Sequence, residues 1–258
     1  MKAKVISIFT QKGGVGKTVS TINISGVLAE MGFKVLVLDV DSQANASLIG
    51  YGLDPDSEYT IIDFFQKSET PIYEERGKDG NVKIIAGSID LITSGLNKDS
   101  LRKAIKKVEN DFDYILIDCP PKPINEELSF GEIAVFASDY IICPVDYDEF
   151  SLDGLTKLII AINKLKTKKG LKAEYLGFFF AKVEEQTVDF KEAYKELSES
   201  PISTLLFQNY TRKNKYVRTS IREGESAVFL KPYNPISMDY RKLTHELLSK
   251  IKINGKEA

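Results

Sequence analysis

The sequence has few cysteines, a single histidine and no long hydrophobic run. Its two cysteines, Cys119 and Cys143, are too far apart for the C-x-x-C spacing of metal and redox sites, so we expect reduced, structural thiols. No apolar stretch approaches the roughly 18 residues of a membrane-spanning helix. The first residues lead directly into an apolar segment, so we expect no signal peptide and a cytoplasmic protein. His245 falls within a helical pattern and is not expected to be a ligand or a base.

The chain also lacks an excess of charge of either sign. Its 35 basic and 37 acidic residues give a net charge of −2, so any basic surface for a nucleic-acid partner must be local. With 258 residues, 43% of them hydrophobic, the chain is long enough for one large α/β domain. We find no repeat and no long linker, and therefore expect residues 1–258 to form a single domain.

Buried-type strands alternate with helical patterns along the chain. This alternation predicts an α/β fold with a mostly parallel, twisted sheet of about seven strands and helices on both faces. Residues 51–81 are less regular, and we expect a surface excursion with one short helix near residues 61–65. Helices are expected to begin near Ser100, Thr187 and Asn234-Pro235. The expected strands are residues 5–9, 34–41, 82–86, 112–118, 140–145 and 175–181, with a short one near 204–207.

The most informative stretch is residues 9–18, which read FTQKGGVGKT. It connects an apolar strand to a helical pattern, which is the context that a phosphate-binding loop requires. Three glycines allow the backbone N–H groups to curl around an anion at the positive end of the helix dipole. In such loops the lysine equivalent to Lys17 reaches the terminal phosphates and the hydroxyl equivalent to Thr18 ligates Mg²⁺. The match to G-x-x-x-x-G-K-[ST] is imperfect, because Gln11 replaces the first glycine.

Carboxylates follow two other apolar strands. Asp118 ends residues 112–118, and a carboxylate there can hold Mg²⁺ beside Thr18. Asp41 ends the next strand after the loop, and parallel strands bring their carboxyl ends to the same edge of a sheet. We therefore expect Asp41 to orient the attacking water, while Asp39 is either an auxiliary group or a cap for a neighbouring loop.

These motifs resemble those of the ParA/MinD group of P-loop ATPases. The loop KGGVGKT is similar to the deviant Walker A loop of that group, and residues 38–47, 114–121 and 137–145 with 150–155 resemble its later motifs. The resemblance is closest to small ParA proteins of the Soj type, with Val19 and Ser42 departing from the usual Thr and Pro. By this resemblance the nucleotide is ATP, and its expected contacts are Lys12, Gly13, Gly14, Val15, Gly16, Lys17, Thr18 and Val19.

The resemblance also implies a mechanism. Lys12 would reach across to the nucleotide of a second subunit, so that ATP and Mg²⁺ lock a homodimer, and Lys12, Lys17 and Asp41 would act in hydrolysis. A ParB-like partner would stimulate a slow ATPase that moves or spaces a plasmid, a chromosome region or another cargo. The ATP-bound protein would then associate with the nucleoid.

Three functional interpretations remain open, which differ in what the protein binds. Residues 210–222 contain five basic residues and no acidic one, which suits non-specific contact with DNA phosphates. A MinD-like, membrane-associated or cargo-positioning ATPase is the alternative, but the last helix is expected to pack on the sheet, so a membrane partner is not expected. A soluble P-loop biosynthetic enzyme is a further alternative. The expected DNA contacts are Arg212, Lys213, Lys215, Arg218 and Arg222.

Overall fold

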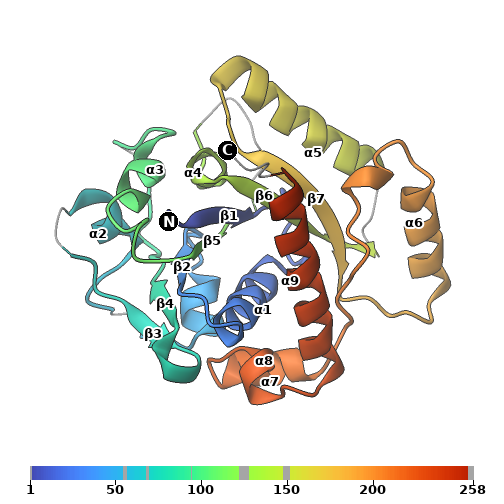
Figure 1. The fold of residues 1–258 in the computed structure, drawn as a ribbon. Coiled ribbons are helices and arrows are strands. Elements are labelled where there is room, and N and C mark those ends of the chain that lie inside the picture. The colour runs from blue at the N-terminus through green and yellow to red at the C-terminus, as the bar shows by residue number, and fades with distance from the viewer. Residues whose placement is uncertain are drawn as a thin grey trace.

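A twisted sheet forms the centre of the computed structural model, which describes residues 2–54, 57–67, 70–93, 95–121, 128–147 and 152–254 (Figure 1). In this described part of the chain the sheet has seven strands in the order β3-β4-β2-β5-β1-β6-β7. All neighbouring pairs are parallel except β3 and β4. The strands are β1 (Lys4–Ile8), β2 (Val35–Asp39), β3 (Glu74–Arg76), β4 (Val82–Ile85), β5 (Tyr114–Asp118), β6 (Tyr140–Asp146) and β7 (Glu174–Ala181).

Helices cover both faces of this sheet. The described helices are α1 (Lys17–Glu30), α2 (Ile61–Gln66), α3 (Ser100–Ile105), α4 (Phe130–Ala137), α5 (Leu152–Lys164), α6 (Val188–Ser198), α7 (Tyr216–Arg222), α8 (Ala227–Leu230) and α9 (Pro235–Asn254). One core packs α1, α8 and α9 against one face of the sheet. A second core packs the five helices from α2 through α6 against the other face. Strand β2 shows why its sequence is apolar throughout: Leu36 and Leu38 enter one core, and Val35 and Val37 enter the other.

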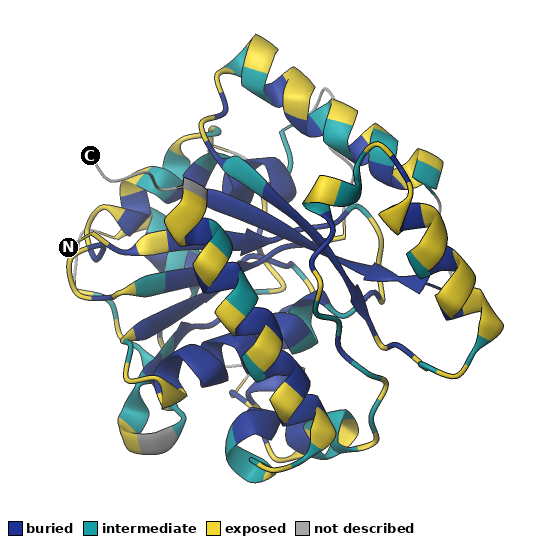
Figure 2. Ribbon diagram, turned by 45° about the vertical axis from the view of Figure 1, so that its right-hand side comes forward, coloured by how far each residue is buried: buried dark blue, intermediate teal, exposed yellow. Residues whose placement is uncertain are grey.

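Burial follows this layered arrangement. The central strands are buried, and exposed residues lie on the outward sides of the helices (Figure 2). Among the described residues, no helix has both the length and the apolar character needed to cross a membrane. The predicted α/β class with a mostly parallel sheet between helices is confirmed. The helix starts at Thr187 and at Asn234-Pro235 are confirmed as well.

The predicted seventh strand near residues 204–207 is wrong. Residues Ser203–Leu205 form a 3₁₀ turn, and Leu206 makes only an isolated parallel bridge to Phe178. The seventh strand is β3, which pairs antiparallel with β4 at the edge of the sheet, inside the segment expected to be irregular. Its sequence, Glu74-Glu75-Arg76, is polar because an edge strand is partly exposed, and its pairing is supported by a Glu75–Lys83 ion pair of 2.8 Å.

Two smaller outcomes concern helix boundaries. The short helix expected near residues 61–65 is confirmed as α2, which begins after a capping box formed by Thr60 and Asp63. The helix expected to be capped by Ser100 begins at that residue instead, and Asp99 occupies the N-cap position.

Candidate functional site

The glycine-rich loop lies between β1 and α1, at the carboxyl edge of the sheet. Its backbone is left-handed at Gly14 (φ 75°) and Gly16 (φ 94°), a conformation that other residues adopt only with strain. Within the described part of the chain, the backbone N–H groups of Gly13, Gly14 and Gly16 donate to no protein acceptor. Together with the N-terminus of α1, these donors form a site suited to an anion.

The two lysines of the loop have different environments. Lys17 is 7% exposed, and its Nζ donates a 3.1 Å hydrogen bond to the carbonyl oxygen of Lys12. The ammonium group of Lys17 is therefore held against the loop. Lys12 itself is exposed on the outer part of the loop. The structure thus separates a buried lysine at the anion site from an exposed lysine at its rim.

Asp118 lies at the end of β5, directly beside the first turn of α1. Its Oδ2 accepts a 2.8 Å hydrogen bond from Thr18 Oγ1, and its Oδ1 accepts a 3.2 Å bond from Thr21 Oγ1. Burial, followed by the nearby charge of Asp39, raises the pKa of Asp118 above its ordinary value. A buried carboxylate of this kind is suited to a cation, and the paired oxygens of Thr18 and Asp118 are ligands that Mg²⁺ prefers.

Asp39 and Asp41 are both buried, but the structure gives them different surroundings. Asp39 Oδ2 accepts hydrogen bonds from the backbone N–H (2.9 Å) and the hydroxyl (2.8 Å) of Ser47, and its Oδ1 accepts from the N–H of Asp41. Burial raises the pKa of Asp39. Asp41 accepts from the N–H of Gln43 at 3.0 Å and lines the cavity beside the loop. Asp39 therefore fixes the chain that follows β2, whereas Asp41 is placed at the site itself.

This cavity has a volume of about 270 Å³. The glycine-rich loop, Asp41 and Pro121, which lies three residues beyond the end of β5, contribute to its lining. The rest of the lining consists of Asn45, Ile49 and Gly50 from the π-helical segment η1 (Asn45–Gly50) and of Ile221 from α7. Sequence reasoning missed Ile49 and Ile221, because neither lies in a motif. The cavity lining from the loop is Gly14, Gly16, Lys17, Thr18 and Val19.

A second cavity, of about 310 Å³, lies beside the same loop. It is lined by Thr10, Gln11 and Lys12 and by the ends of β6 and α5, and its wall is chiefly apolar. Although it is the larger of the two, it does not contain Lys17, Thr18 or Asp41. We therefore place the functional site in the smaller cavity, where the donors for an anion and the ligands for a cation meet.

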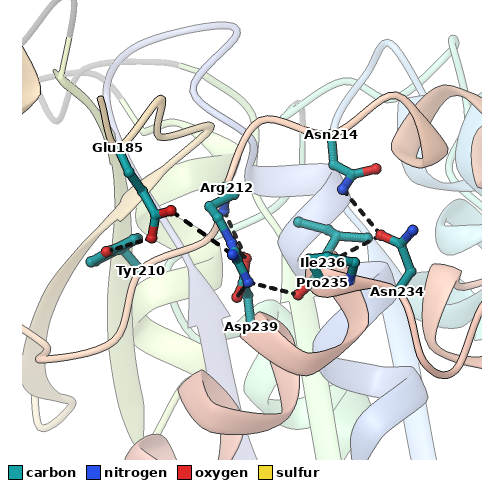
Figure 3. A network of polar contacts seen from close by, with 8 residues as sticks. All are labelled: Glu185, Tyr210, Arg212, Asn214, Asn234, Pro235, Ile236 and Asp239. Carbon is teal, nitrogen blue, oxygen red and sulfur yellow. Dashed lines mark hydrogen bonds and ion pairs between the residues drawn. The ribbon is translucent and has the colours of Figure 1, made fainter. Parts of the chain in front are cut away.

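The basic segment near the carboxyl end divides into two parts. The Arg212 guanidinium donates to Asp239 at 2.9 and 2.6 Å, and these bonds raise the pKa of Arg212 (Figure 3). The Arg212 guanidinium is therefore paired with a carboxylate of α9, and its expected contact with DNA stays a prediction. Lys213 forms an ion pair with Glu184. Lys215, Arg218 and Arg222 are exposed at or on α7, and Arg222 pairs with the adjacent Glu223 at 3.0 Å.

A glycine-rich loop follows β1, a helix begins at the lysine of this loop, and the Thr18 hydroxyl of that helix pairs with the Asp118 carboxylate of the neighbouring strand β5. Together these features define a P-loop nucleoside triphosphatase. Comparisons with known proteins narrow this class. Residues 3–174 match a family model described as an AAA domain. The chromosome partitioning protein ParA of Caulobacter vibrioides is 30% identical over 67% of each chain. The chain belongs to the ParA/MinD group of P-loop ATPases.

Solved structures agree with this assignment. The septum site-determining protein MinD of Pyrococcus horikoshii, complexed with Mg-ADP, superposes with a TM-score of 0.73 and is 27% identical, covering 99% of this chain and 100% of its own. Cobyrinic acid a,c-diamide synthase of Mycobacterium smegmatis, with an ATP analogue and magnesium bound, has a TM-score of 0.79 at 20% identity, covering 98% and 97% of the two chains. The latter likeness is one of fold alone.

Proposed function

We propose that this protein is a ParA-like ATPase that binds ATP and Mg²⁺, dimerises and positions a plasmid, a chromosome region or another cargo. The observation that carries the proposal is the pairing of a buried Lys17 and an exposed Lys12 in one loop, beside Thr18, Asp118 and Asp41. A partner protein of the ParB kind would accelerate slow hydrolysis. The protein would be cytoplasmic, and its ATP-bound form would associate with the nucleoid.

Each residue of the site has a distinct role in this proposal. The backbone donors of residues 13–18 and the Lys17 ammonium hold the phosphate oxygens as their charge increases in the transition state. Thr18 and Asp118 would hold the magnesium ion, which supplies charge neutralisation for the transferred phosphoryl group when it is bound. Asp41 accepts a hydrogen bond from the attacking water and so orients it. Ile49 and Ile221 offer apolar surface to the nucleoside end of ATP.

In this proposal Lys12 makes dimerisation depend on ATP. Lys12 is an exposed residue of the loop, where a second subunit can approach. When two copies meet at this loop, each Lys12 would contact the phosphates that its partner holds. The triphosphate supplies the negative charge that offsets the burial of both lysines, so dimerisation depends on ATP and is lost with ADP.

The exposed basic residues of α7 are the proposed contacts to DNA phosphates. Replacing both Arg218 and Arg222 by alanine is expected to weaken binding of the ATP-bound protein to DNA of any sequence. Because two phosphate contacts are lost, the slope of log K against log salt should fall by about 2. Fluorescence anisotropy at several salt concentrations measures both quantities.

A matched control exists on α6. Lys191 and Lys195 are also exposed and four residues apart on one helix, so Lys191→Ala with Lys195→Ala removes the same charge elsewhere. The control is expected to bind DNA as the wild type does. Equal losses in the two double variants would show that α7 has no special part in DNA binding.

One experiment separates the candidate functions. The purified protein is incubated with DNA or with anionic liposomes, each with ATP and with ADP, and the retained fraction is measured by sedimentation. Retention by DNA with ATP alone is the result expected of a ParA-like ATPase. Retention by liposomes would favour the MinD-like alternative, and retention by neither would favour a soluble biosynthetic enzyme.

A further inference from the structure

Arg212 is the centre of a polar cluster that joins three separate parts of the chain (Figure 3). Its Nε donates to Asp239 Oδ2 at 2.9 Å, its Nη2 donates to Asp239 Oδ1 at 2.6 Å, and its backbone N–H donates to Asp239 Oδ2 at 3.1 Å. Its Nη1 also lies 3.8 Å from Glu185 Oε2. The Asp239 side chain is 8% exposed and that of Arg212 is 35% exposed, so the carboxylate of this bidentate pair is the buried member. We name this pair the Arg212–Asp239 clamp.

The clamp fixes the start of α9 at a point that also contacts the helix of the phosphate loop. Tyr240, the next residue after Asp239, is buried, and its hydroxyl lies 3.3 Å from Ser20 Oγ on α1. Ser20 is two residues beyond Thr18. Thr211, the neighbour of Arg212, is buried, and its backbone N–H donates to the carbonyl oxygen of Phe180 on β7. The clamp therefore joins residues 211–212 to α9 at the level of the first turn of α1.

The same segment leads directly into a wall of the cavity. Asn214 donates from its Nδ2 to Asn234 Oδ1 at 3.0 Å, and its own Oδ1 accepts the N–H of Tyr216, the first residue of α7. Five residues later α7 places Ile221 in the wall of the cavity that the glycine-rich loop also lines. At the end of α7, Gly224 is packed so closely on the Tyr51 carbonyl that a Cβ would lie 2.7 Å from its oxygen. The position of Ile221 therefore depends on how both ends of α7 are held.

We propose that Arg212 is a positioning residue for nucleotide binding: through its pair with Asp239 it holds α7 and Ile221 against the nucleoside part of ATP. Arg212 is not among the residues that line the cavity, so it acts through α7 and not by direct contact. The polyphosphate end of the ligand is held by the loop, and in the described part of the chain neither Arg212 nor Asp239 forms a hydrogen bond or ion pair with a residue of that loop. This inference rests on the proposed function, because it requires ATP in the cavity.

The division between the two ends of the ligand provides the test. Binding of Mg-ATP and of Mg-tripolyphosphate, which lacks the nucleoside, is measured by calorimetry for the wild type and for Arg212→Gln. The dissociation constant for ATP is expected to rise about tenfold or more, since a wall displaced by about 1 Å loses its contacts, while that for tripolyphosphate changes less than about twofold. Arg212→Lys, which keeps the charge and one bond, should recover part of the ATP affinity.

Arg241 offers a matched control on the same helix. Its guanidinium also forms a bidentate pair, with Glu30 at 2.6 and 2.7 Å, but Glu30 lies at the far end of α1 from the loop. Arg241→Gln should therefore leave the affinity for both ligands unchanged. Asp239→Asn should reproduce the effect of Arg212→Gln, and the double variant should add little to either single one.

The outcomes are separable. Unchanged ATP affinity in Arg212→Gln, or equal weakening of ATP and tripolyphosphate in folded Arg212→Gln and Arg212→Lys, overturns the inference and leaves the proposed function intact. A wild type that binds ATP but not tripolyphosphate also overturns it, because the two ends would then not bind independently. A wild type that binds neither ligand would refute the proposed function itself.

Discussion

With Lys17 replaced by alanine, the protein is expected to lose measurable ATP binding. Lys17 is buried at the head of α1, and its Nζ is held over the loop by the carbonyl of Lys12. Removing it deletes the one loop ammonium in the cavity wall and with it charge-assisted bonds to phosphate. A loss of about 3 kcal/mol or more corresponds to about a hundredfold or more in the dissociation constant, which calorimetry measures directly.

Lys12 provides the matched control within the same loop. Because it lies at the exposed rim, Lys12→Ala is expected to bind ATP within about threefold of the wild type but to stay monomeric with ATP. Sedimentation velocity with ATP and with ADP measures the second effect. If Lys12→Ala lost ATP binding while Lys17→Ala kept it, the roles assigned to the two lysines would have to be exchanged. Dimerisation of Lys12→Ala to the wild-type extent would remove Lys12 from the interface.

The fold was predictable where burial determines the sequence. Strands β1, β2, β4, β5, β6 and β7 are covered on both faces, and each therefore appears as an apolar run in the sequence. Strand β3 is different. It is short, charged and at the sheet edge, so its pairing with β4 depends on a neighbouring strand and leaves no local pattern. The apolar residues near 204–207 showed the converse error, because Leu206 and Phe207 are buried against β7 without forming a strand of their own.

The candidate site divides in the same way. The glycine-rich loop, Asp41 and Asp118 were predictable, because a phosphate site needs these residue types directly after strands of one sheet. Ile49 and Ile221 were not, since they reach the cavity only when η1 and α7 pack together. The pairing of Arg212 was not predictable either, because its carboxylate partner Asp239 is 27 residues away in sequence, and a count of charges along the chain cannot detect such a pair. Side-chain partnership, and not charge alone, decides which basic residues face solvent.

Replacing Asp41 by alanine is expected to stop ATP hydrolysis while ATP binding persists. Asp41 lines the cavity, and its carboxylate accepts a hydrogen bond from the N–H of Gln43. Its removal therefore leaves the loop and the Thr18–Asp118 hydrogen bond in place. Loss of a group that positions the attacking water lowers turnover by about 10²–10⁴-fold. Release of phosphate measures turnover. Sedimentation with ATP should show that the dimer accumulates, because hydrolysis no longer converts its ATP to ADP.

Asp39 separates a catalytic effect from a structural one, because it is the last residue of β2 and lies only two residues before Asp41. Asp39→Ala removes the acceptor of the Ser47 N–H, the Ser47 hydroxyl and the Asp41 N–H, which would leave buried donors unpaired. The free energy of unfolding, measured with urea, should fall by about 2–4 kcal/mol in Asp39→Ala and by less than about 1 kcal/mol in Asp41→Ala. Hydrolysis at the wild-type rate in Asp41→Ala would show that another group orients the water. A large loss of stability in that variant would show instead that Asp41 supports the fold, as Asp39 does.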